Sequence, residues 1–203
     1  MIGVVDYGLS NVGAILNMLK KLGVPALASD RAEALERSEK LILPGVGAFD
    51  AAMARLRELD LLAFLERRVR REGVPFLGIC LGMQVLAEAS AEGGMAGLGW
   101  IAGRNVRLRR DGGARVPHMG WSDVALTADE PLFRHLPANS SRFYFVHSYC
   151  LEPADPACIV ARCGYGGGFV AAVRLDNIRG VQFHPEKSHR FGLALLGNFA
   201  ARC

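Results

Sequence analysis

Residues 74–84 of this 203-residue chain read Val-Pro-Phe-Leu-Gly-Ile-Cys-Leu-Gly-Met-Gln. An apolar run leads directly into Cys80, and Gly78 and Gly82 stand two places to either side of it. This is the Gly-x-nucleophile-x-Gly pattern of a sharp turn from a strand into a helix, with cysteine where hydrolases often carry serine. A side chain two places from the nucleophile would collide with a neighbouring strand or helix, which glycine avoids.

The turn would also place Cys80 at the start of the following helix. The partial positive charge of a helix N-terminus stabilises a thiolate, which is the reactive form of cysteine. A buried core cysteine between two packing glycines is the alternative interpretation, and this segment alone does not exclude it.

Length and composition favour one globular unit. With 203 residues, 51% of them hydrophobic, the chain can bury one substantial core, and we expect a single domain over residues 1–203. The formal net charge is +4, and basic and acidic residues are interleaved, so the sequence gives no sign of a nucleic-acid-binding tract.

Cysteine usage and the N-terminus bear on location. The five cysteines are odd in number and contain no Cys-x-x-Cys, which favours free thiols in a reducing compartment. Residues 1–6 lack a basic leader and no apolar run is long enough to span a bilayer, so we expect a cytoplasmic protein without a membrane segment.

The first half of the chain alternates strand and helix patterns. We expect strands at residues 2–5, 25–28 and 41–43 and in the run into Cys80. We expect helices from a Ser10 cap to Gly23, at 32–36, at 51–59 and at 61–71. Such alternation predicts an α/β fold, with an open, mostly parallel or mixed central sheet and helices on both faces.

The second half changes character. Residues 104–116 alternate around Asp111-Gly112-Gly113, which predicts a hairpin. Its five arginines could dock an acidic partner, although a solvated face is the favoured interpretation. Further strands are expected at 142–146, 159–163, 169–173 and 180–183, and a final helix at 191–201.

A thiolate nucleophile needs a base that also protonates the leaving group, and a third group that orients that base. His184 and Glu186 are the candidates, because residues two apart in extended backbone point the same way. Pro185 between them supplies no N–H and suits a strand end, where catalytic groups gather in open α/β sheets. Taken alone, this segment fits a surface turn equally well. The catalytic interpretation becomes strong only in combination with the Cys80 pattern.

An oxyanion hole would complete the constellation. The backbone N–H of Leu81, directly after the nucleophile, is the first expected donor. A second donor is expected from Pro44-Gly45-Val46-Gly47, which follows a buried strand and whose glycines permit unusual φ angles. An ordinary tight turn is the alternative interpretation of that segment.

These motifs together resemble the class I, or triad, glutamine amidotransferases, which carry a flavodoxin-like sheet. In order along nearly the whole chain, several segments resemble the glutaminase subunits of imidazole glycerol phosphate synthase. They are Asp6-Tyr7-Gly8 with Asn11, residues 43–49, Pro117-His118-Met119-Gly120-Trp121, residues 144–149 and residues 182–188. Two departures are Ser122, where the family usually has Asn, and Leu9-Ser10, where it has a more glycine-rich turn.

The resemblance implies a mechanism. Cys80 attacks the side-chain amide of glutamine, His184 protonates the departing ammonia and then activates water, and Glu186 orients His184. The oxyanion donors would be Leu81 with Val46 and Gly47. The pocket for the amino-acid end of glutamine would be formed by Gln84 with His147, Ser148 and Tyr149, although an isolated histidine such as His147 is more often structural.

The resemblance also implies a partner. It is a cyclase subunit with a (β/α)8 barrel, which uses the ammonia to make imidazole glycerol phosphate and an aminoimidazole carboxamide ribotide. Asn11, Trp121 and Lys187 are the expected docking residues. We expect no cofactor and no metal, because His118, His147 and Cys150 lack a recognised ligand spacing.

Three alternatives remain open from the residues alone. The chain could be the glutaminase of another amidotransferase, of the anthranilate or pyridoxal phosphate synthase type. It could be a cysteine-dependent peptidase or hydrolase, or a non-catalytic docking module. For the glutaminase of imidazole glycerol phosphate synthase, we add the hypothesis that a peptide flip at Gly45-Val46 or Val46-Gly47 moves an oxyanion donor in or out.

Overall fold

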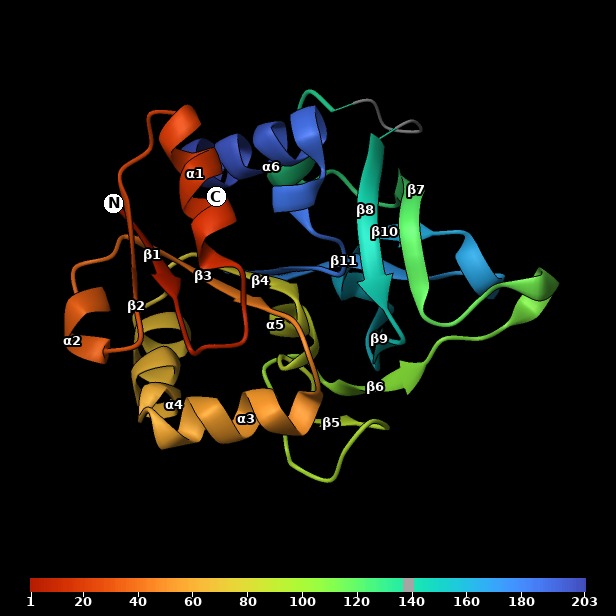
Figure 1. Ribbon diagram of the computed structural model, residues 1–203, viewed down its shortest axis with the longest axis horizontal. Coiled ribbons are helices and arrows are strands. Elements are labelled where there is room, and N and C mark those ends of the chain that lie inside the picture. The colour runs from red at the N-terminus through yellow and green to blue at the C-terminus, as the bar shows by residue number, and fades with distance from the viewer. Residues whose placement is uncertain (137–140) are drawn as a thin grey trace.

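The computed structural model describes residues 1–136 and 141–203 (Figure 1). Its described strands form a nine-stranded sheet in the order β2-β1-β3-β4-β12-β11-β10-β7-β8, and a small sheet in the order β5-β6-β9. The five strands from β2 to β12 run parallel, and the four strands that follow alternate in direction. The sheet is therefore mixed, with its parallel half built mainly from the first part of the chain.

The strands of the first half and the small sheet are β1 Ile2–Val5, β2 Ala26–Ser29, β3 Lys40–Gly45, β4 Phe76–Cys80, β5 Ala89–Ser90 and β6 Gly103–Arg107. Those that follow are β7 His118–Leu126, β8 Ser141–His147, β9 Tyr149–Pro153, β10 Ile159–Cys163, β11 Phe169–Leu175 and β12 Ile178–Val181. The helices are α1 Val12–Lys21, α2 Ala32–Leu35, α3 Phe49–Glu58, α4 Leu61–Leu65, α5 Leu81–Gln84 and α6 His189–Arg202. A π-helical turn, Glu66–Arg71, extends α4, and a 3₁₀ turn, Pro185–Lys187, precedes α6.

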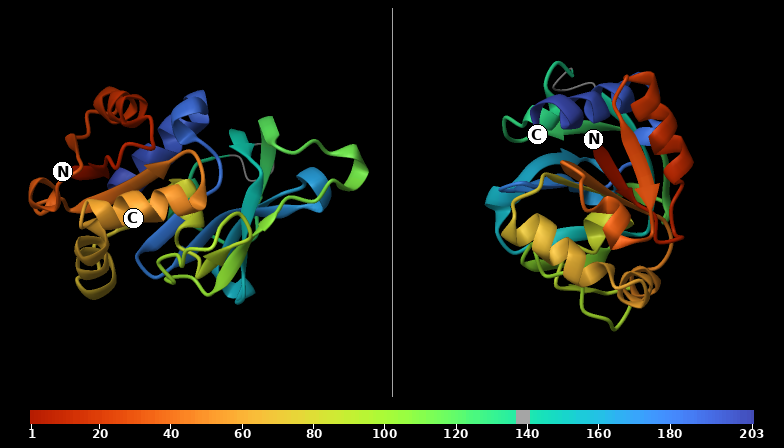
Figure 2. Two further views of the ribbon diagram at one scale, coloured as in Figure 1. Left: turned by 60° about the horizontal axis from the view of Figure 1, so that its bottom comes forward. Right: turned by 90° about the vertical axis from the view of Figure 1, so that its left-hand side faces the viewer.

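Helices cover both faces of the sheet (Figures 1 and 2). Side chains alternate along β1, so that Val4 packs with α1 and α6 while Val5 packs with α3, α4 and α5. The same alternation separates Ile42 from its neighbours Leu41 and Leu43 on β3. This arrangement confirms the predicted α/β class with helices on both faces.

The parallel strands bring the candidate residues to one edge. Gly45 at the end of β3 lies beside Cys80 at the end of β4. Val181 of β12 lies beside Ile79, so the chain that follows β12 emerges next to Cys80. Carboxyl ends of parallel strands meet at one edge of a sheet, and this register gathers residues that are far apart in sequence.

The backbone at Cys80 has the strained geometry that the sequence predicts. Its φ of 54° and ψ of −106° lie in a region that residues with a side chain rarely adopt. A Cβ at Gly82 would overlap the carbonyl oxygen of Leu43, and one at Gly78 would overlap the backbone of Gly82. The two glycines therefore permit the tight strand-to-helix turn for the steric reason inferred from their spacing.

Two local predictions are wrong. The N-cap of α1 is Asn11 rather than Ser10, because the side-chain oxygen of Asn11 accepts the N–H of Ala14 at 3.2 Å. The segment around Asp111-Gly112-Gly113 is no hairpin but a short 3₁₀ turn between β6 and β7. Strand β6 pairs with β5 and β9, and the chain beyond the turn is fixed through Arg115, whose backbone N–H donates to the hydroxyl of Tyr165 at 2.9 Å.

Several elements differ in extent from their predictions or were missed. The predicted helix over residues 61–71 is α helical only to Leu65 and continues as the π-helical turn. Strands β5, β7 and β9 were not predicted. Strand β7 lacks a clear alternation of apolar and polar residues, because its exposed positions include the apolar residues Met119 and Trp121. Within the described residues, no helix is long and apolar enough to cross a membrane.

The close approach at Gly82 gives a stability prediction. Gly82→Ala is expected to lower the free energy of unfolding by about 1–3 kcal/mol, because the added methyl group pushes α5 away from the Leu43 carbonyl. Denaturant unfolding measures this change. Gly94→Ala is the control, since a Cβ there meets no atom within 4 Å among the described residues. Equal stability of both variants would contradict the steric account of the turn.

Candidate active site

His184 and Glu186 form a buried pair at the end of β12. The Nδ1–H of His184 donates to Oε1 of Glu186 at 2.7 Å, and their side chains are 1% and 6% exposed. The backbone around them is fixed by β8, because the N–H of His184 donates to the carbonyl of Tyr144 at 2.9 Å. Ser188 ties the same segment down by donating its hydroxyl to the carbonyl of His184 at 2.6 Å.

Cys80 also acts on the His184 ring. The Nε2 atom of His184 has no conventional hydrogen-bond partner among residues 1–136 and 141–203, but the Cys80 side chain is close enough to act on its charge. Burial lowers the pKa of His184, while the Cys80 sulfur and the Glu186 carboxylate outweigh this effect and raise the pKa to about 10. The imidazole is therefore protonated at neutral pH, as a proton donor to a leaving group must be.

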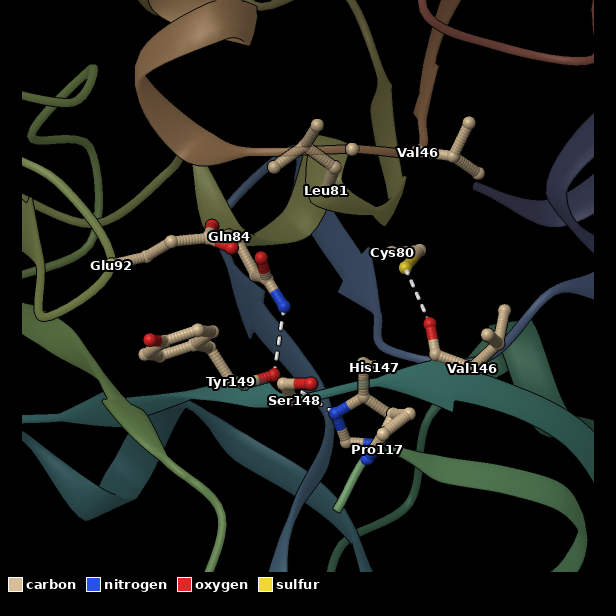
Figure 3. Close-up of a pocket in the computed structure, with 11 residues that line it drawn as sticks. Val46, Cys80, Leu81, Gln84, Glu92, Pro117, Val146, His147, Ser148 and Tyr149 are labelled. Carbon is tan, nitrogen blue, oxygen red and sulfur yellow. Dashed lines mark hydrogen bonds between the residues drawn. The ribbon is translucent and has the colours of Figure 1, made fainter.

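A pocket opens in front of Cys80 (Figure 3). Its volume is about 250 Å³, at the small end for ligand sites. All seven of the predicted substrate and oxyanion residues line it. The lining consists of Val46, Gly47, Cys80, Leu81, Gln84, Glu92, Pro117, Val146, His147, Ser148 and Tyr149.

The two sides of the pocket are joined by hydrogen bonds. The thiol of Cys80 donates to the carbonyl of Val146 at 4.0 Å, and the amide of Gln84 donates to the carbonyl of Tyr149 at 2.8 Å (Figure 3). The nitrogen of Gln84 also donates to the side-chain oxygen of Gln182 at 3.1 Å. Only the amide oxygen of Gln84 is left outside these contacts, so it is the atom that Gln84 can offer to a ligand.

His147 lines the pocket but has both ring nitrogens engaged. Its Nδ1–H donates to the carbonyl of Tyr149 at 2.8 Å, so its Nε2 accepts from Nδ1 of His118 at 3.3 Å. The Nε2 of His118 in turn accepts from the hydroxyl of Ser122 at 2.9 Å. Burial lowers the pKa of both rings, of His147 to about 3 and of His118 to about 4. The arrangement favours a structural role for His147, as a support for Tyr149.

The predicted oxyanion segment is in a closed arrangement. The N–H of Val46 donates to the carbonyl of Leu9 at 2.7 Å and is not free for a ligand. Gly47 has a φ of 112°, which favours glycine, and no atom lies within 4 Å of the position of a Cβ there. Leu81 lies directly after Cys80 at the start of α5. A role for the Val46 N–H as the second oxyanion donor therefore requires this loop to move, and the role of Gly47 stays a prediction.

Three residues near the site had no predicted role. Glu92 is the one carboxylate among the residues that line the pocket, and it accepts the N–H of Phe49 at 2.9 Å. Tyr7 has a buried hydroxyl without a partner in the described part of the chain, and burial and the charge of Cys80 raise its pKa. Gln182 donates to the sulfur of Cys80 at 3.6 Å. Glu92 gave no signal because the segment around it has no periodicity.

Two of the predicted docking residues, Trp121 and Lys187, contact Tyr144, whose carbonyl accepts the N–H of His184. Trp121 packs edge-on against Tyr144, with ring centroids 6.0 Å apart, and the ammonium of Lys187 lies 5.7 Å from the centroid of the same ring. Trp121 is 38% exposed and Met119, on the same strand, 63%. The side chain of Asn11 caps α1. Their role in docking stays a prediction.

Comparisons with known proteins identify the family. The sequence matches the family described as Glutamine amidotransferase class-I over residues 3–203. The chain is a class I glutamine amidotransferase. This class I glutamine amidotransferase is 50% identical over 199 residues to imidazole glycerol phosphate synthase subunit HisH 2 of Pseudomonas aeruginosa, with 98% of each chain covered. It is 48% identical over 203 residues to subunit HisH of Bdellovibrio bacteriovorus, with 98% of this chain and 99% of that protein covered.

Solved structures support the same fold. The class I glutamine amidotransferase is similar to a structure described as a glutamine amidotransferase, with a TM-score of 0.71, 24% identity and coverage of 97% and 98%. It is also similar to PurLQS from Thermotoga maritima, with a TM-score of 0.72, 19% identity and coverage of 98% and 96%. At these identities the likeness concerns the fold alone.

The neutral histidine pair gives a pH prediction. Because the pKa of His118 falls from 6.5 to about 4 on folding, only the unfolded chain binds a proton there between these values. The free energy of unfolding of the class I glutamine amidotransferase should therefore fall as the pH drops from 6.5 towards 4. His118→Phe keeps the stacking on Tyr165 and should reduce that slope by about 1 kcal/mol per pH unit. Denaturant unfolding across this range measures it, and an unchanged slope would mean that the folded imidazole ionises.

Proposed function

We propose that this class I glutamine amidotransferase is the glutaminase subunit of imidazole glycerol phosphate synthase. It hydrolyses glutamine to glutamate and ammonia and passes the ammonia to a separate cyclase subunit. The observation that carries the proposal is the buried His184–Glu186 pair beside Cys80, at a strained turn that opens into a pocket. The extent of the similarity to HisH subunits supports this glutaminase over those of other synthases.

The first half-reaction forms a thioester. The Cys80 thiolate attacks the amide carbon of the glutamine side chain, and a C–S bond forms while the carbonyl oxygen becomes an oxyanion. His184 then gives its proton to the amide nitrogen, the C–N bond breaks, and ammonia leaves. The raised pKa of His184 supports this role, because the ring holds a proton at neutral pH.

The second half-reaction releases glutamate. His184, now neutral, takes a proton from water as the water oxygen attacks the thioester carbon. The C–S bond breaks, the thiolate returns, and the imidazole is protonated again. Glu186 holds Nδ1–H throughout, which fixes the tautomer and leaves Nε2 for proton transfer.

The pocket suits the amino-acid end of glutamine. Glu92 supplies the negative charge that an α-ammonium group requires, and the amide oxygen of Gln84 can accept a further hydrogen bond. The backbone at Ser148 and Tyr149 forms the opposite wall. A pocket of about 250 Å³ also argues against a peptidase, whose substrates are larger.

The partner is a cyclase with a (β/α)8 barrel, which converts a phosphorylated intermediate with this ammonia. The exposed apolar side chains of Met119 and Trp121 on β7 support a docking surface there, since Trp121 and Lys187 both contact the ring of Tyr144. Asn11 belongs to the same proposed surface. We also propose that residues 1–203 act as one domain in the cytoplasm, where the five cysteines would stay reduced.

The closed oxyanion loop supports regulation by the partner. With the Val46 N–H donated to Leu9, the site has one donor fewer, which costs roughly a hundredfold or more in rate. A peptide flip next to Val46 would turn an N–H toward the oxyanion. Docking and the acceptor ligand would favour the flipped state, so that glutamine is hydrolysed only when ammonia can be used.

The nucleophile gives the test of the function. Cys80→Ala is expected to reduce glutamate release from glutamine by about a thousandfold or more, measured with the cyclase partner present. Cys203→Ala, whose half-buried thiol lies outside the pocket, is the control and should hydrolyse glutamine at the rate of the unaltered protein. Equal rates for the Cys80 variant and the control would favour a docking module without catalysis.

Gly47 gives the test of the regulation. Gly47→Ala meets no steric obstacle among the described residues but disfavours the φ of 112°, so it perturbs the loop alone. The factor by which partner and ligand stimulate glutamine hydrolysis is expected to change by about tenfold or more. Its upper limit is the effect of one oxyanion donor on the rate, which is roughly a hundredfold or more. Gly45→Ala is less informative because its Cβ would collide with the hydroxyl of Tyr7. Gly94→Ala is the control and should keep the stimulation of the unaltered protein. Unchanged stimulation in Gly47→Ala as well would refute the proposed peptide flip.

A further inference from the structure

Gln182 is a buried amide in contact with the candidate nucleophile. It directly follows β12, its side chain is fully buried, and its Nε2 lies 3.6 Å from the sulfur of Cys80. Its backbone N–H donates to the carbonyl of Ala171 at 2.9 Å, so the residue is held by the sheet. The mechanism above does not use this group.

The orientation of the Gln182 amide follows from its neighbours. The carbonyl of Tyr149 can only accept, so Gln84 must present its nitrogen to it, at 2.8 Å. The second hydrogen of that nitrogen points to Gln182, 3.1 Å away, which must therefore present its oxygen. The nitrogen of Gln182 is thereby left for the sulfur, and the contact with Cys80 is an N–H donated to sulfur.

This chain of amides is held at several points. Asn105 donates to the backbone carbonyl of Gln84 at 2.9 Å, and His147 donates to the carbonyl of Tyr149 at 2.8 Å. Both amides are almost completely buried, so water does not compete for these bonds. The donor to the sulfur is thus fixed before a substrate arrives, which is how a polar group contributes to catalysis without reorganisation.

We propose that Gln182 is a catalytic residue that stabilises the Cys80 thiolate by donating an N–H to it, in an orientation set by Gln84. The inference rests on the proposed function only in taking Cys80 as the nucleophile. A hydrogen bond to an anionic sulfur is stronger than one to a thiol or a thioester. The contact therefore favours the thiolate both before attack and when the C–S bond of the thioester breaks, where a stabilised thiolate is the better leaving group.

The pocket and the nucleophile become one hydrogen-bonded unit through this contact. Gln84 lines the glutamine pocket with its remaining oxygen, and its nitrogen fixes the group that touches the sulfur. The ionisable groups that also act on Cys80 or its partner ring are His184 with Glu186, Tyr7, and His147 beyond His184. A substitution at position 182 leaves all four in place.

Alkylation of Cys80 tests the proposal. Gln182→Met keeps the length of the side chain and removes the donor. The rate of modification of Cys80 by iodoacetamide is followed between pH 5 and pH 10 by mass spectrometry of the peptide that contains it. The midpoint of this profile is expected to move by about one unit toward higher pH, the size expected for a lost hydrogen bond to a charged group.

A matched control is Asn198→Leu. Asn198 is a buried amide of α6 that donates to the backbone carbonyls of Leu132 and Arg134, and its loss tests destabilisation without touching the sulfur. The control should keep the midpoint of the unaltered protein. Thermal unfolding of each variant shows whether it is folded. If Gln182→Met is not folded, Gln84→Met replaces it. In Gln84→Met the amide of Gln182 loses its fixed orientation, and the midpoint of the alkylation profile should rise by a smaller amount.

The outcomes separate this inference from the proposed function. A midpoint that is unchanged in the folded Gln182 or Gln84 variant overturns the inference, whatever the rate of glutamine hydrolysis. A shifted midpoint in the variant, combined with an unaltered protein that releases no glutamate from glutamine in the presence of the cyclase partner, supports the inference and refutes the function. Accumulation of a thioester on Cys80 in Gln182→Met, detected as an added mass in the same peptide, would be further support because it marks a slower second half-reaction.

Discussion

The contact between α5 and β3 is the constraint on which the candidate site depends. Helix α5 starts so close to β3 that no Cβ fits at Gly82 against the carbonyl of Leu43. This approach forces Cys80 into a positive φ and directs its side chain away from the sheet toward the pocket. The strain is tolerated because β4 is buried between two parallel neighbours, whose hydrogen bonds and packing exceed the cost of one unfavourable residue.

The buried ion pair follows from the same register. A protonated imidazole in a protein interior is costly unless an anion compensates it. Glu186 and the Cys80 sulfur both act on His184, and the raised pKa reflects both. Since β12 lies beside β4, the segment that carries the pair emerges where the sulfur is held. The approach of this pair to the sulfur is thus a property of strand order, whereas the bond between His184 and Glu186 is local.

The sequence predicted what local sterics determine. The spacing of Gly78 and Gly82 predicted the elbow at Cys80, and the structure has the expected backbone there. The imidazole–carboxylate bond of His184 and Glu186 was also predicted, but from extended backbone, whereas a 3₁₀ turn over Pro185–Lys187 brings Glu186 back to the ring. The Asp111–Gly113 turn was misinterpreted because a glycine-rich turn has the same local signal whether its flanking strands pair with each other or with distant partners. The contacts of Gln182 and Glu92 could not be predicted from the sequence, because they join segments that are brought together only by the folded sheet.

The proposed docking surface and the candidate site share one strand pair. In the β7–β8 register, Trp121 lies opposite Tyr144 and His118 lies opposite His147. The carbonyl of Tyr144 receives the N–H of His184, so a displacement of this pair moves the imidazole relative to the sulfur. Two residues further along β8, Val146 presents its carbonyl to the same sulfur. A partner that presses on the β7 face would therefore act on two neighbours of the sulfur at once, His184 and Val146, and no separate pathway is needed to couple docking to chemistry.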